Sequence, residues 1–458
     1  MIRFLPLILI LLCFPAASAQ SYLLGADLSF VPELESCGVQ WKENNAARDV
    51  FAIFKDNGAT TIRIRLWHSP QGNHSGFSDA DTLIARSKKL GLNVILDFHY
   101  SDTWTDPSNQ KCPAAWNGVL TNNTRLADSL YNYTKSVLQR LKDKGRMPEF
   151  VQVGNETNGG MCFGGDGKVT WPTDWTKMKL LFNAGIKAVR ETDPSCKIIL
   201  HVADPQHAEW WAGELNKNGV TDYDILGISY YPIIHTNKKI ADVGTVISNI
   251  RNTYKKDVLI VETSLPWSNS WDDNTTNMMN GAPDGYGTDP TPEIQAKWLT
   301  DLSNKVKASG GLGVIYWEPE WVASGKASCP QAFGGSTWEN QAFFDFNNNL
   351  MVNGGIRFFG KPIVNVNNQP PLANERTSLS TAHTSAGMTV TLDGISTPNA
   401  RLTIFTVDGS LLYETLLQVN RGKIVHALPN LSLVIKNSVA ILSIRYGTTT
   451  QSCQLFFR

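Results

Sequence analysis

Short runs of apolar and β-branched residues recur eight times between residues 22 and 319, and segments with helical spacing lie between them. The helical segments, such as AARDVFAIFKDNG, DADTLIARSKKLG and TKMKLLFNAGIKAVRETD, repeat apolar residues every three to four positions. The eight runs predict strands at residues 22–30, 61–67, 93–100, 150–156, 197–203, 225–231, 258–263 and 313–319. Strands that alternate with helices predict a parallel sheet of the α/β class, and eight units favour a closed (β/α)₈ TIM barrel.

Reactive side chains gather at the C-terminal ends of these runs. In a (β/α)₈ barrel those ends meet at one mouth, where the active site lies. A doubly wound open sheet is the alternative fold, but no GxGxxG fingerprint follows any run. The residues that we expect at the mouth are Arg65, His99, Asn155, Glu156, His201, Tyr230, Tyr231, Glu262 and Trp317.

The amino-acid composition and the apolar pattern of the chain change after residue 361, so residues 20–361 are expected to form the barrel domain. Residues 362–374 are rich in Asn and Pro and predict a linker. Residues 375–458 alternate with period two between turn residues, which predicts a small all-β sandwich. Its segment ARLTIFTVDGSLLYETLL and the final LFFR loosely resemble the C-terminal sorting modules of proteins exported by the type IX system. An accessory module for stability or spacing is the other interpretation.

Residues 1–19 have the layout of a cleavable signal peptide. Arg3 precedes a short apolar run that ends at Ala17-Ser18-Ala19, and the run is too short to span a membrane. A lipid anchor on Cys13 is disfavoured, because Leu12 stands where such signals carry a small residue. We therefore expect an exported protein that is extracellular, surface-bound or periplasmic. Six cysteines remain after cleavage, an even number that allows disulfides in 15 pairings.

Charge and aromatic content narrow the classes of partner. Forty-one basic residues balance forty-one acidic ones, so nothing favours nucleic acid or an anionic membrane surface. All fourteen tryptophans lie between Trp41 and Trp338. Because rigid aromatic faces stack on sugars as well as in cores, a ligand surface is expected in the first 360 residues rather than in the tail. We expect a monomer.

Glu156 and Glu262 are suited to glycoside hydrolysis. A retaining hydrolase uses two carboxyl groups about 5–5.5 Å apart, one as nucleophile and one as acid/base. Glu156 and Glu262 end the fourth and seventh predicted strands and so share one rim. Asn155 could hold a substrate hydroxyl. The acid must carry a proton, so we expect the higher pKa on Glu156.

Several motifs together resemble glycoside hydrolase family 53, the arabinogalactan endo-β-1,4-galactanases. The resemblance runs from about residue 22 to 360 and implies a retaining enzyme that cleaves within β-1,4-galactan of type I arabinogalactan and pectin, with no required cofactor. It implies Glu156 as acid/base, Glu262 as nucleophile, Arg65 steadying the nucleophile, Tyr230 near it, and Trp317 under the sugar at the cleavage point. The motifs are GADLSFVPELESCGVQWKE, IRIRLWHSPQGN, LDFHYSDTWTDPSNQKCPAAW, VQVGNETNGGM, DILGISYYP and VETSLPW.

Other residues keep two interpretations each. His99 and His201 could bind sugar hydroxyls or be core histidines. Asp102 and Trp104 are expected to supply a hydroxyl acceptor and a stacking platform. Of the two arginines on one strand face, the deeper Arg63 is expected to be structural. Trp116 and Trp321 could be outer platforms or core, Glu318 is expected to point away toward the helices, and Glu320 replaces a small residue of the family and could alter an outer subsite.

The loop after the seventh strand is rich in oxygen ligands. Asp272, Asp273, Asn274 and Asn277 would suit a structural calcium ion, as in some bacterial members of the family, although ordinary solvated loop chemistry is the preferred explanation. Two rival functions also stay open. One is a β-mannanase or cellulase on the same type of barrel, and the other is a non-catalytic polysaccharide-binding protein.

Overall fold

The computed structural model describes residues 22–324 and 335–360, together with seven strands between residues 378 and 457. The predicted signal peptide, residues 1–19, and the predicted linker, residues 362–374, lie outside the described residues. The chain divides into two compact units, Met1–Lys361 and Pro362–Arg458.

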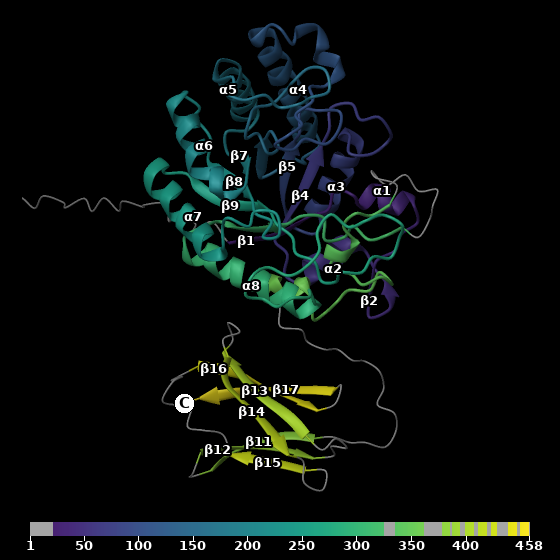
Figure 1. The fold of residues 1–458 in the computed structure, drawn as a ribbon. Coiled ribbons are helices and arrows are strands. Elements are labelled where there is room, and N and C mark those ends of the chain that lie inside the picture. Colours follow the sequence, from purple (N-terminus) through teal and green to yellow (C-terminus); the bar gives the residue numbers. More distant parts are fainter. Residues whose placement is uncertain are drawn as a thin grey trace, which may run out of the picture. The chain divides into compact units, whose positions relative to one another are not determined.

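The first unit is a closed barrel of eight parallel strands (Figure 1), which confirms the predicted (β/α)₈ fold. The first strand pairs on one side with the last and on the other with the second, so the sheet has no free edge. The strands are β1 (Leu23–Asp27), β4 (Thr61–Leu66), β5 (Asn93–Phe98), β6 (Phe150–Val153), β7 (Lys197–Ala203), β8 (Ile225–Ser229), β9 (Asp257–Glu262) and β10 (Gly313–Tyr316). A short hairpin of two-residue strands, β2 (Lys42–Glu43) and β3 (Ala46–Ala47), lies in the connection between β1 and β4.

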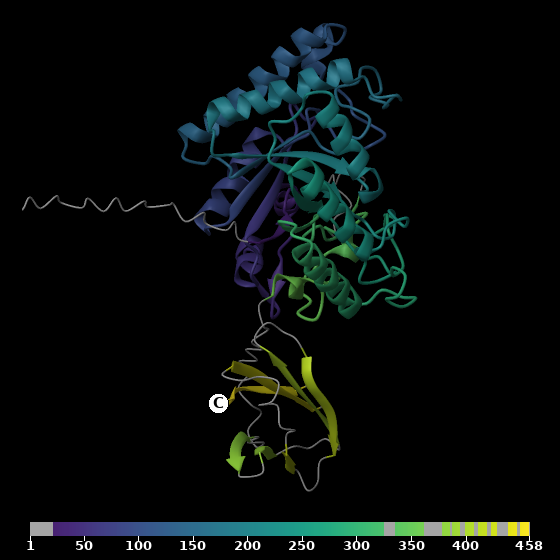
Figure 2. The ribbon, with the colours of Figure 1, turned by 90° about the vertical axis from the view of Figure 1, so that its left-hand side faces the viewer.

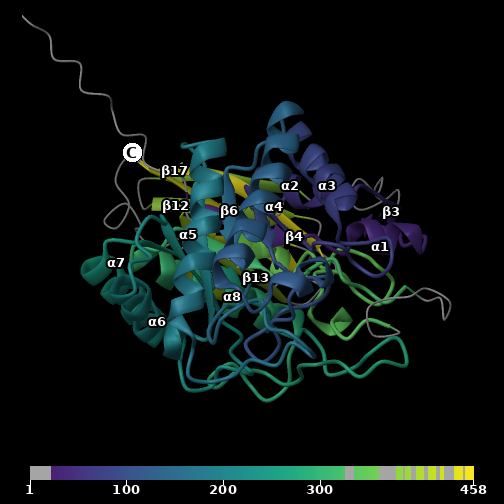
Figure 3. The same cartoon turned by 90° about the horizontal axis from the view of Figure 1, so that it is seen from above.

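Helices surround the barrel, and several begin at polar residues whose side chains cap the first turn. The Asn122 side chain accepts from the Arg125 amide, and the Asp174 side chain accepts from the Thr176 amide. Helices α4 and α5 pack side by side on one flank (Figure 2), and α6 and α7 do so on the next (Figure 3). The helices are α1 (Val31–Ser36), α2 (Val50–Asp56), α3 (Phe77–Lys89), α4 (Asn123–Asp143), α5 (Trp175–Thr192), α6 (Pro205–Lys217), α7 (Ile240–Tyr254) and α8 (Pro292–Ala308).

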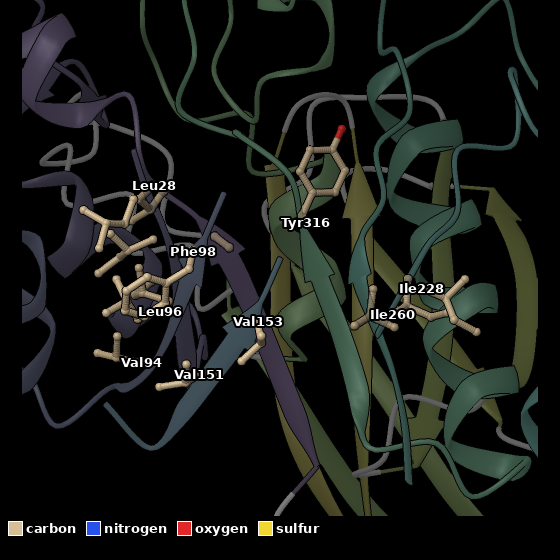
Figure 4. Close-up of a cluster of buried hydrophobic side chains, with 14 of the residues drawn as sticks. Leu28, Val94, Leu96, Phe98, Val151, Val153, Ile228, Ile260 and Tyr316 are labelled. Carbon is tan, nitrogen blue, oxygen red and sulfur yellow. The ribbon is translucent and has the colours of Figure 1, made fainter. Parts of the chain in front are cut away.

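The barrel strands are buried on both faces, which explains why their sequences are almost continuously apolar. One face fills the barrel interior and the other packs against the helices, and each fully buried aliphatic side chain contributes about 1.5–3 kcal/mol. Figure 4 shows part of the helix-facing layer, including Leu96, Phe98, Val151 and Ile260. The interior layer comprises Leu23, Ile95, Phe150, Ile199, Ile225, Leu259, Val261 and Ile315.

The second unit contains two antiparallel sheets, as expected for the predicted β-sandwich. Alternate residues of the larger sheet are buried, among them Leu402 and Ile404 on one strand and Leu442 and Ile444 on its neighbour. The smaller sheet has the order β11 (Ser378–Thr384), β12 (Gly387–Asp393), β15 (Lys423–Ala427), and the larger has β14 (Leu411–Gln418), β13 (Asn399–Thr406), β16 (Ser438–Tyr446), β17 (Thr449–Phe457). Among the helices that the structure describes, none is long and apolar enough to cross a membrane.

Candidate active site

The mouth of the barrel brings Glu156 and Glu262 face to face. One carboxylate oxygen of each lies within 4.8 Å of the other. That separation fits the roughly 5–5.5 Å of a retaining pair, whereas an inverting pair needs about 6.5–9.5 Å to admit a water molecule. Both side chains are largely buried, so their charges act on each other with little screening.

A sharp turn after β6 presents Glu156 to the mouth. Gly154 and Glu156 both have left-handed backbone, with φ of 87° and 46°. Left-handed backbone in a residue other than glycine costs about 1–3 kcal/mol and persists only where neighbours enforce it. The neighbours here are on β7: the Thr157 amide donates to the His201 carbonyl at 3.0 Å, and the Glu156 amide donates to His201 Nδ1 at 3.2 Å. The strain therefore serves to aim one carboxyl group.

Glu262 is surrounded by groups that favour its ionised form. The guanidinium of Arg63 lies 2.8 Å from Oε1, and the hydroxyls of Tyr231 and Ser229 donate to Oε2 at 2.9 and 3.2 Å. Arg63 is itself held by Asp27 at 2.7 Å and by Asp97 at 2.8 Å. Opposite charge and donated hydrogen bonds both stabilise a carboxylate.

The environments of the two glutamates differ as an acid and a nucleophile require. Burial, followed by repulsion from Glu262, raises the pKa of Glu156 well above its ordinary value. Burial also raises the pKa of Glu262, but Arg63 and the Tyr231 hydroxyl oppose that rise. The pair therefore holds its proton on Glu156, as expected from the sequence.

A buried polar network supports both glutamates from below. Gln152 on β6 donates to Asp97 at 2.6 Å and contacts His201 Nδ1 at 3.0 Å, while its carbonyl oxygen accepts from Arg63 at 3.2 Å. Asn155 accepts from Arg63 at 2.9 Å and donates to the Thr105 carbonyl at 2.8 Å. Gln152 was not among the residues predicted from the sequence, although a lone polar residue inside the apolar strand FVQV indicates its position.

Comparison with known proteins agrees with this geometry. The model of glycosyl hydrolase family 53 matches residues 23–354. An arabinogalactan endo-β-1,4-galactanase of Cellvibrio japonicus is 39% identical over 330 residues, covering 71% of this chain and 86% of that protein. An endo-β-1,4-galactanase of Bacillus subtilis is 37% identical over 373 residues, covering 72% of this chain and 83% of that protein.

The chain belongs to glycosyl hydrolase family 53. Solved structures agree: the family 53 catalytic domain of Ignisphaera aggregans superimposes with a TM-score of 0.66 at 30% identity, covering 75% of this chain and 97% of that domain. A fungal β-1,4-galactanase gives a TM-score of 0.64 at 28% identity, with 75% and 100% covered. This chain is therefore a glycoside hydrolase, and its barrel carries the family resemblance.

The family resemblance placed Arg65 and Tyr230 beside the nucleophile, and both placements are wrong for the side chains. Arg63, not Arg65, contacts Glu262, because the Arg65 guanidinium is turned to Glu318 at 2.6 Å. The hydroxyl of Tyr231, not that of Tyr230, donates to the Glu262 carboxylate, whereas the Tyr230 hydroxyl donates to the Lys238 carbonyl at 2.8 Å and its ring packs on Trp298. In each case the correct residue is a close neighbour of the predicted one.

His201 positions the catalytic loop, and its contacts favour the interpretation as a core histidine over a contact with sugar. Its side chain is fully buried, and its Nε2 contacts Ser229 Oγ at 2.8 Å while Nδ1 faces the Glu156 amide. Burial, together with the positive charge of Arg63, lowers the pKa of His201 well below its ordinary value, so the ring is neutral. Both ring nitrogens are therefore occupied by the protein.

His99 and Asp102 also have protein partners. His99 contacts Asp97 at 3.1 Å through Nε2 and Thr105 Oγ1 at 3.0 Å through Nδ1. The Asp102 carboxylate accepts from the amides of Ser69 and Ala114 at 2.9 and 2.8 Å, which ties two loops together. Contacts of His99 and Asp102 with sugar hydroxyls stay predictions.

Aromatic rings line part of the mouth. Trp317 lies just after β10, with its ring centroid 4.6 Å from that of Trp338 and 5.9 Å from that of Trp104. Trp104 also covers the Arg65 guanidinium at 4.1 Å. Trp317 and Trp104 are partly exposed, so a sugar ring can reach them, and their roles as stacking surfaces stay predictions. Trp116 and Trp321 are buried, so the core interpretation holds for both.

Glu318 and Glu320 form a buried acidic pair behind this aromatic wall. Glu318 is fully buried, and it pairs with Arg65 and the Phe30 amide rather than with the outer helices as expected. Glu320 is also fully buried and accepts from the Phe30 amide at 3.2 Å, so its side chain does not itself face an outer subsite. Burial raises the pKa of Glu318 to about 8.

In the oxygen-rich loop after β9, the side chain of Asp273 is hydrogen-bonded to backbone amides of the protein. Asp273 accepts from the amides of Thr275 and Ser336, both at 2.7 Å, and the Asn277 side chain donates to the Ser270 carbonyl at 3.3 Å. Asn274 and Asp272 are exposed. Within residues 22–324 and 335–360, acidic or histidine ligands converge in a group of three only at Glu156, His201 and Glu262. Calcium also accepts amide and carbonyl oxygens, and the buried Oδ1 of Asn277 has no hydrogen-bond partner among the described residues, so a structural calcium ion in this loop stays a prediction.

The described cysteines do not all form disulfides. Cys112, Cys162 and Cys196 are buried free thiols, and Cys37 is disulfide-bonded. The Cys112 and Cys162 side chains hydrogen-bond each other where their two loops meet, with the Cys112 amide donating to the Phe163 carbonyl at 2.8 Å.

Proposed function

We propose that this protein is an endo-acting, retaining hydrolase of β-1,4-galactan, the polysaccharide of type I arabinogalactan and of pectic side chains. The observation that carries the proposal is the pairing of Glu156 and Glu262 within 4.8 Å, in a family whose named relatives are endo-β-1,4-galactanases. The separation favours double displacement with retention.

In the first step Glu262 attacks the anomeric carbon, and Glu156 gives its proton to the departing glycosidic oxygen. Arg63 and the Tyr231 hydroxyl keep Glu262 ionised, so the nucleophile is ready when the sugar binds. Burial keeps Glu156 protonated at the pH where Glu262 is charged. The bond from the anomeric carbon to Glu262 Oε forms as the bond to the leaving oxygen breaks.

In the second step Glu156 acts as a base. Once Glu262 is esterified its negative charge is gone, and with it one of the two largest causes of the raised pKa of Glu156. The pKa of Glu156 therefore falls during the glycosyl-enzyme stage, so the same group that lost a proton can take one from the attacking water. The released sugar keeps its β configuration.

The direct test uses purified protein and linear β-1,4-galactan. We expect internal cleavage, with a rapid fall in viscosity and short galacto-oligosaccharides as products. Glu262→Ala should lose several orders of magnitude in turnover, and azide should restore part of it and yield a glycosyl azide. Full activity of Glu262→Ala without azide would contradict the assignment of the nucleophile.

The rival functions give different outcomes in the same assay. A β-mannanase or a cellulase would release oligosaccharides from mannan or cellulose and leave galactan intact. A non-catalytic binding protein would retain galactan without shortening it. The family match and the paired glutamates both favour a galactanase.

We further propose that turnover needs no cofactor, and that the protein acts as an exported monomer. The chemistry of both steps is complete with carboxyl groups and water. The signal-like residues 1–19 support export, and N-terminal sequencing of the mature protein should begin at Gln20. Light scattering of the purified protein should give the mass of one chain. A bound calcium ion in the loop of Asp272 and Asp273 would appear in elemental analysis of the dialysed protein.

A further inference from the structure

Two tryptophans outside the catalytic network are exposed and lie close together. Trp171 lies in the connection from β6 to α5, and Trp210 lies on α6. Their side chains are 58% and 44% exposed, although their ring centroids are only 6.1 Å apart with an interplanar angle of 44°. An exposed indole gains little of the free energy that burial of its apolar surface would give. A neighbouring pair of exposed tryptophans on the surface therefore points to a ligand.

The chain fixes this pair to the catalytic loop. Trp171 packs over Gly159, where a Cβ atom would lie 3.2 Å from the indole and 2.3 Å from Val169 Cγ1. A side chain at position 159 would therefore displace the ring. Gly159 follows the acid/base Glu156 by three residues, so Trp171 is anchored to the same loop.

A second set of bonds ties that loop to the start of α6. The Asn158 side chain donates to the Ala203 carbonyl and accepts from the Ala203 amide, both at 2.8 Å. Asp204, which follows, has left-handed backbone with φ of 66° and caps α6 by accepting from the Gln206 amide at 2.9 Å. Trp171 and Trp210 thus lie on the two segments that follow β6 and β7, and the bonds of Asn158 to Ala203 link these segments.

Polar side chains flank the ring of Trp210. Gln206 and His207 are exposed and stand four and three positions before it on α6, so they share its face of the helix. A surface that combines aromatic faces with hydrogen-bonding groups is suited to a sugar chain, whose rings have apolar faces and hydroxyl edges.

We propose that Trp171 and Trp210 form a stacking platform for a β-1,4-galactan chain outside the cleavage subsites, with Gln206 and His207 contacting its hydroxyls. The proposal rests on the proposed function and extends it. An enzyme that cuts within a polymer meets chain that continues past the cleavage point, and the platform is continuous with the loop of Glu156. Its role is to hold polymer, and it takes no part in bond cleavage.

The test compares long and short substrates in Trp171→Ala, Trp210→Ala and the double variant. We expect the KM for polymeric galactan to rise about tenfold in the double variant, since each aromatic contact contributes about three- to tenfold. Turnover and KM on a short chromogenic galactobioside should stay at the wild-type values. Leu180→Ala is the matched control, because Leu180 is a large apolar residue on α5 that is also exposed, at 37%.

Binding without cleavage gives a second readout, by electrophoresis in gels that contain galactan. Wild type and Leu180→Ala should be retarded, the double variant much less, and Trp171→Phe with Trp210→Phe should recover most of the retardation. Equal retardation of the double variant and wild type would overturn the platform, as would equal losses on short and long substrates. If wild type is retarded more than the double variant but never shortens galactan, the proposed function is contradicted and the stacking platform is supported.

Discussion

Replacing Tyr231 with phenylalanine isolates one hydrogen bond to the nucleophile. The Tyr231 hydroxyl donates to Glu262 Oε2 at 2.9 Å inside a buried site, and burial raises the pKa of Tyr231 well above its ordinary value, so the phenol remains a donor at every working pH. Tyr231→Phe keeps the ring and its packing against Trp338 while it removes only the donor. The change therefore acts on the stability of the Glu262 carboxylate.

The size of the effect follows from the charge of the acceptor. A hydrogen bond to a charged group contributes about 1.5–3 kcal/mol, and 1.36 kcal/mol corresponds to one pKa unit, so the loss amounts to about 1–2 units. Because the bond stabilises the ionised form, its removal raises the pKa of Glu262. Ser229 still donates to the same oxygen at 3.2 Å, which favours the lower end of that range.

The assay is the pH profile of kcat/KM on galactan. The acidic limb reports ionisation of the nucleophile in the free enzyme, so it should move to higher pH by about one unit in Tyr231→Phe. Tyr230→Phe is the matched control, because its hydroxyl donates to the neutral Lys238 carbonyl, and its acidic limb should not move. A shift in Tyr230→Phe with none in Tyr231→Phe would refute the placement of these two side chains.

Three further predictions concern the support of the site. Arg63→Met leaves buried carboxylates without their cation, so the free energy of unfolding should fall by about 3–5 kcal/mol in chemical denaturation. The same variant should lose galactan turnover. Arg65→Met is the control and should keep measurable turnover, because Arg65 pairs with Glu318. Cys112, Cys162 and Cys196 are buried, so iodoacetamide followed by peptide mapping should label them only after unfolding; labelling in the native protein would contradict their burial. Dialysis against EDTA should leave turnover unchanged, and a loss that calcium restores would contradict the proposal that turnover needs no cofactor.

The fold could be predicted because each barrel strand is a short apolar run between helical segments, but the strand ends could not. The run from 150 to 156 reads as one strand, whereas β6 stops at Val153, and Gly154 and Glu156 then adopt left-handed backbone. Glu156 and its neighbour Asn155 lie in this turn. Their conformation is imposed by hydrogen bonds from β7, a contact between distant parts of the chain.

The choice between neighbouring residues failed for a related reason. In the run ILGISYY both faces are buried, so hydrophobicity does not show which tyrosine points inward. Ser229 and Tyr231 reach Glu262, while Tyr230 faces Trp298. For the arginines, barrel strands are tilted and staggered, so position along one strand does not give height relative to another. Arg63, although deeper on β4, is the one that meets the end of β9.

Arg63 is shared by three carboxylates, those of Asp27, Asp97 and Glu262. A guanidinium with a single anionic partner would lose its anchor at the moment that partner became an ester. Arg63 keeps two, so the floor of the site stays in place while a sugar is attached and is already complete when the free carboxylate returns. The cost of rearranging dipoles between the two half-reactions is thereby kept low.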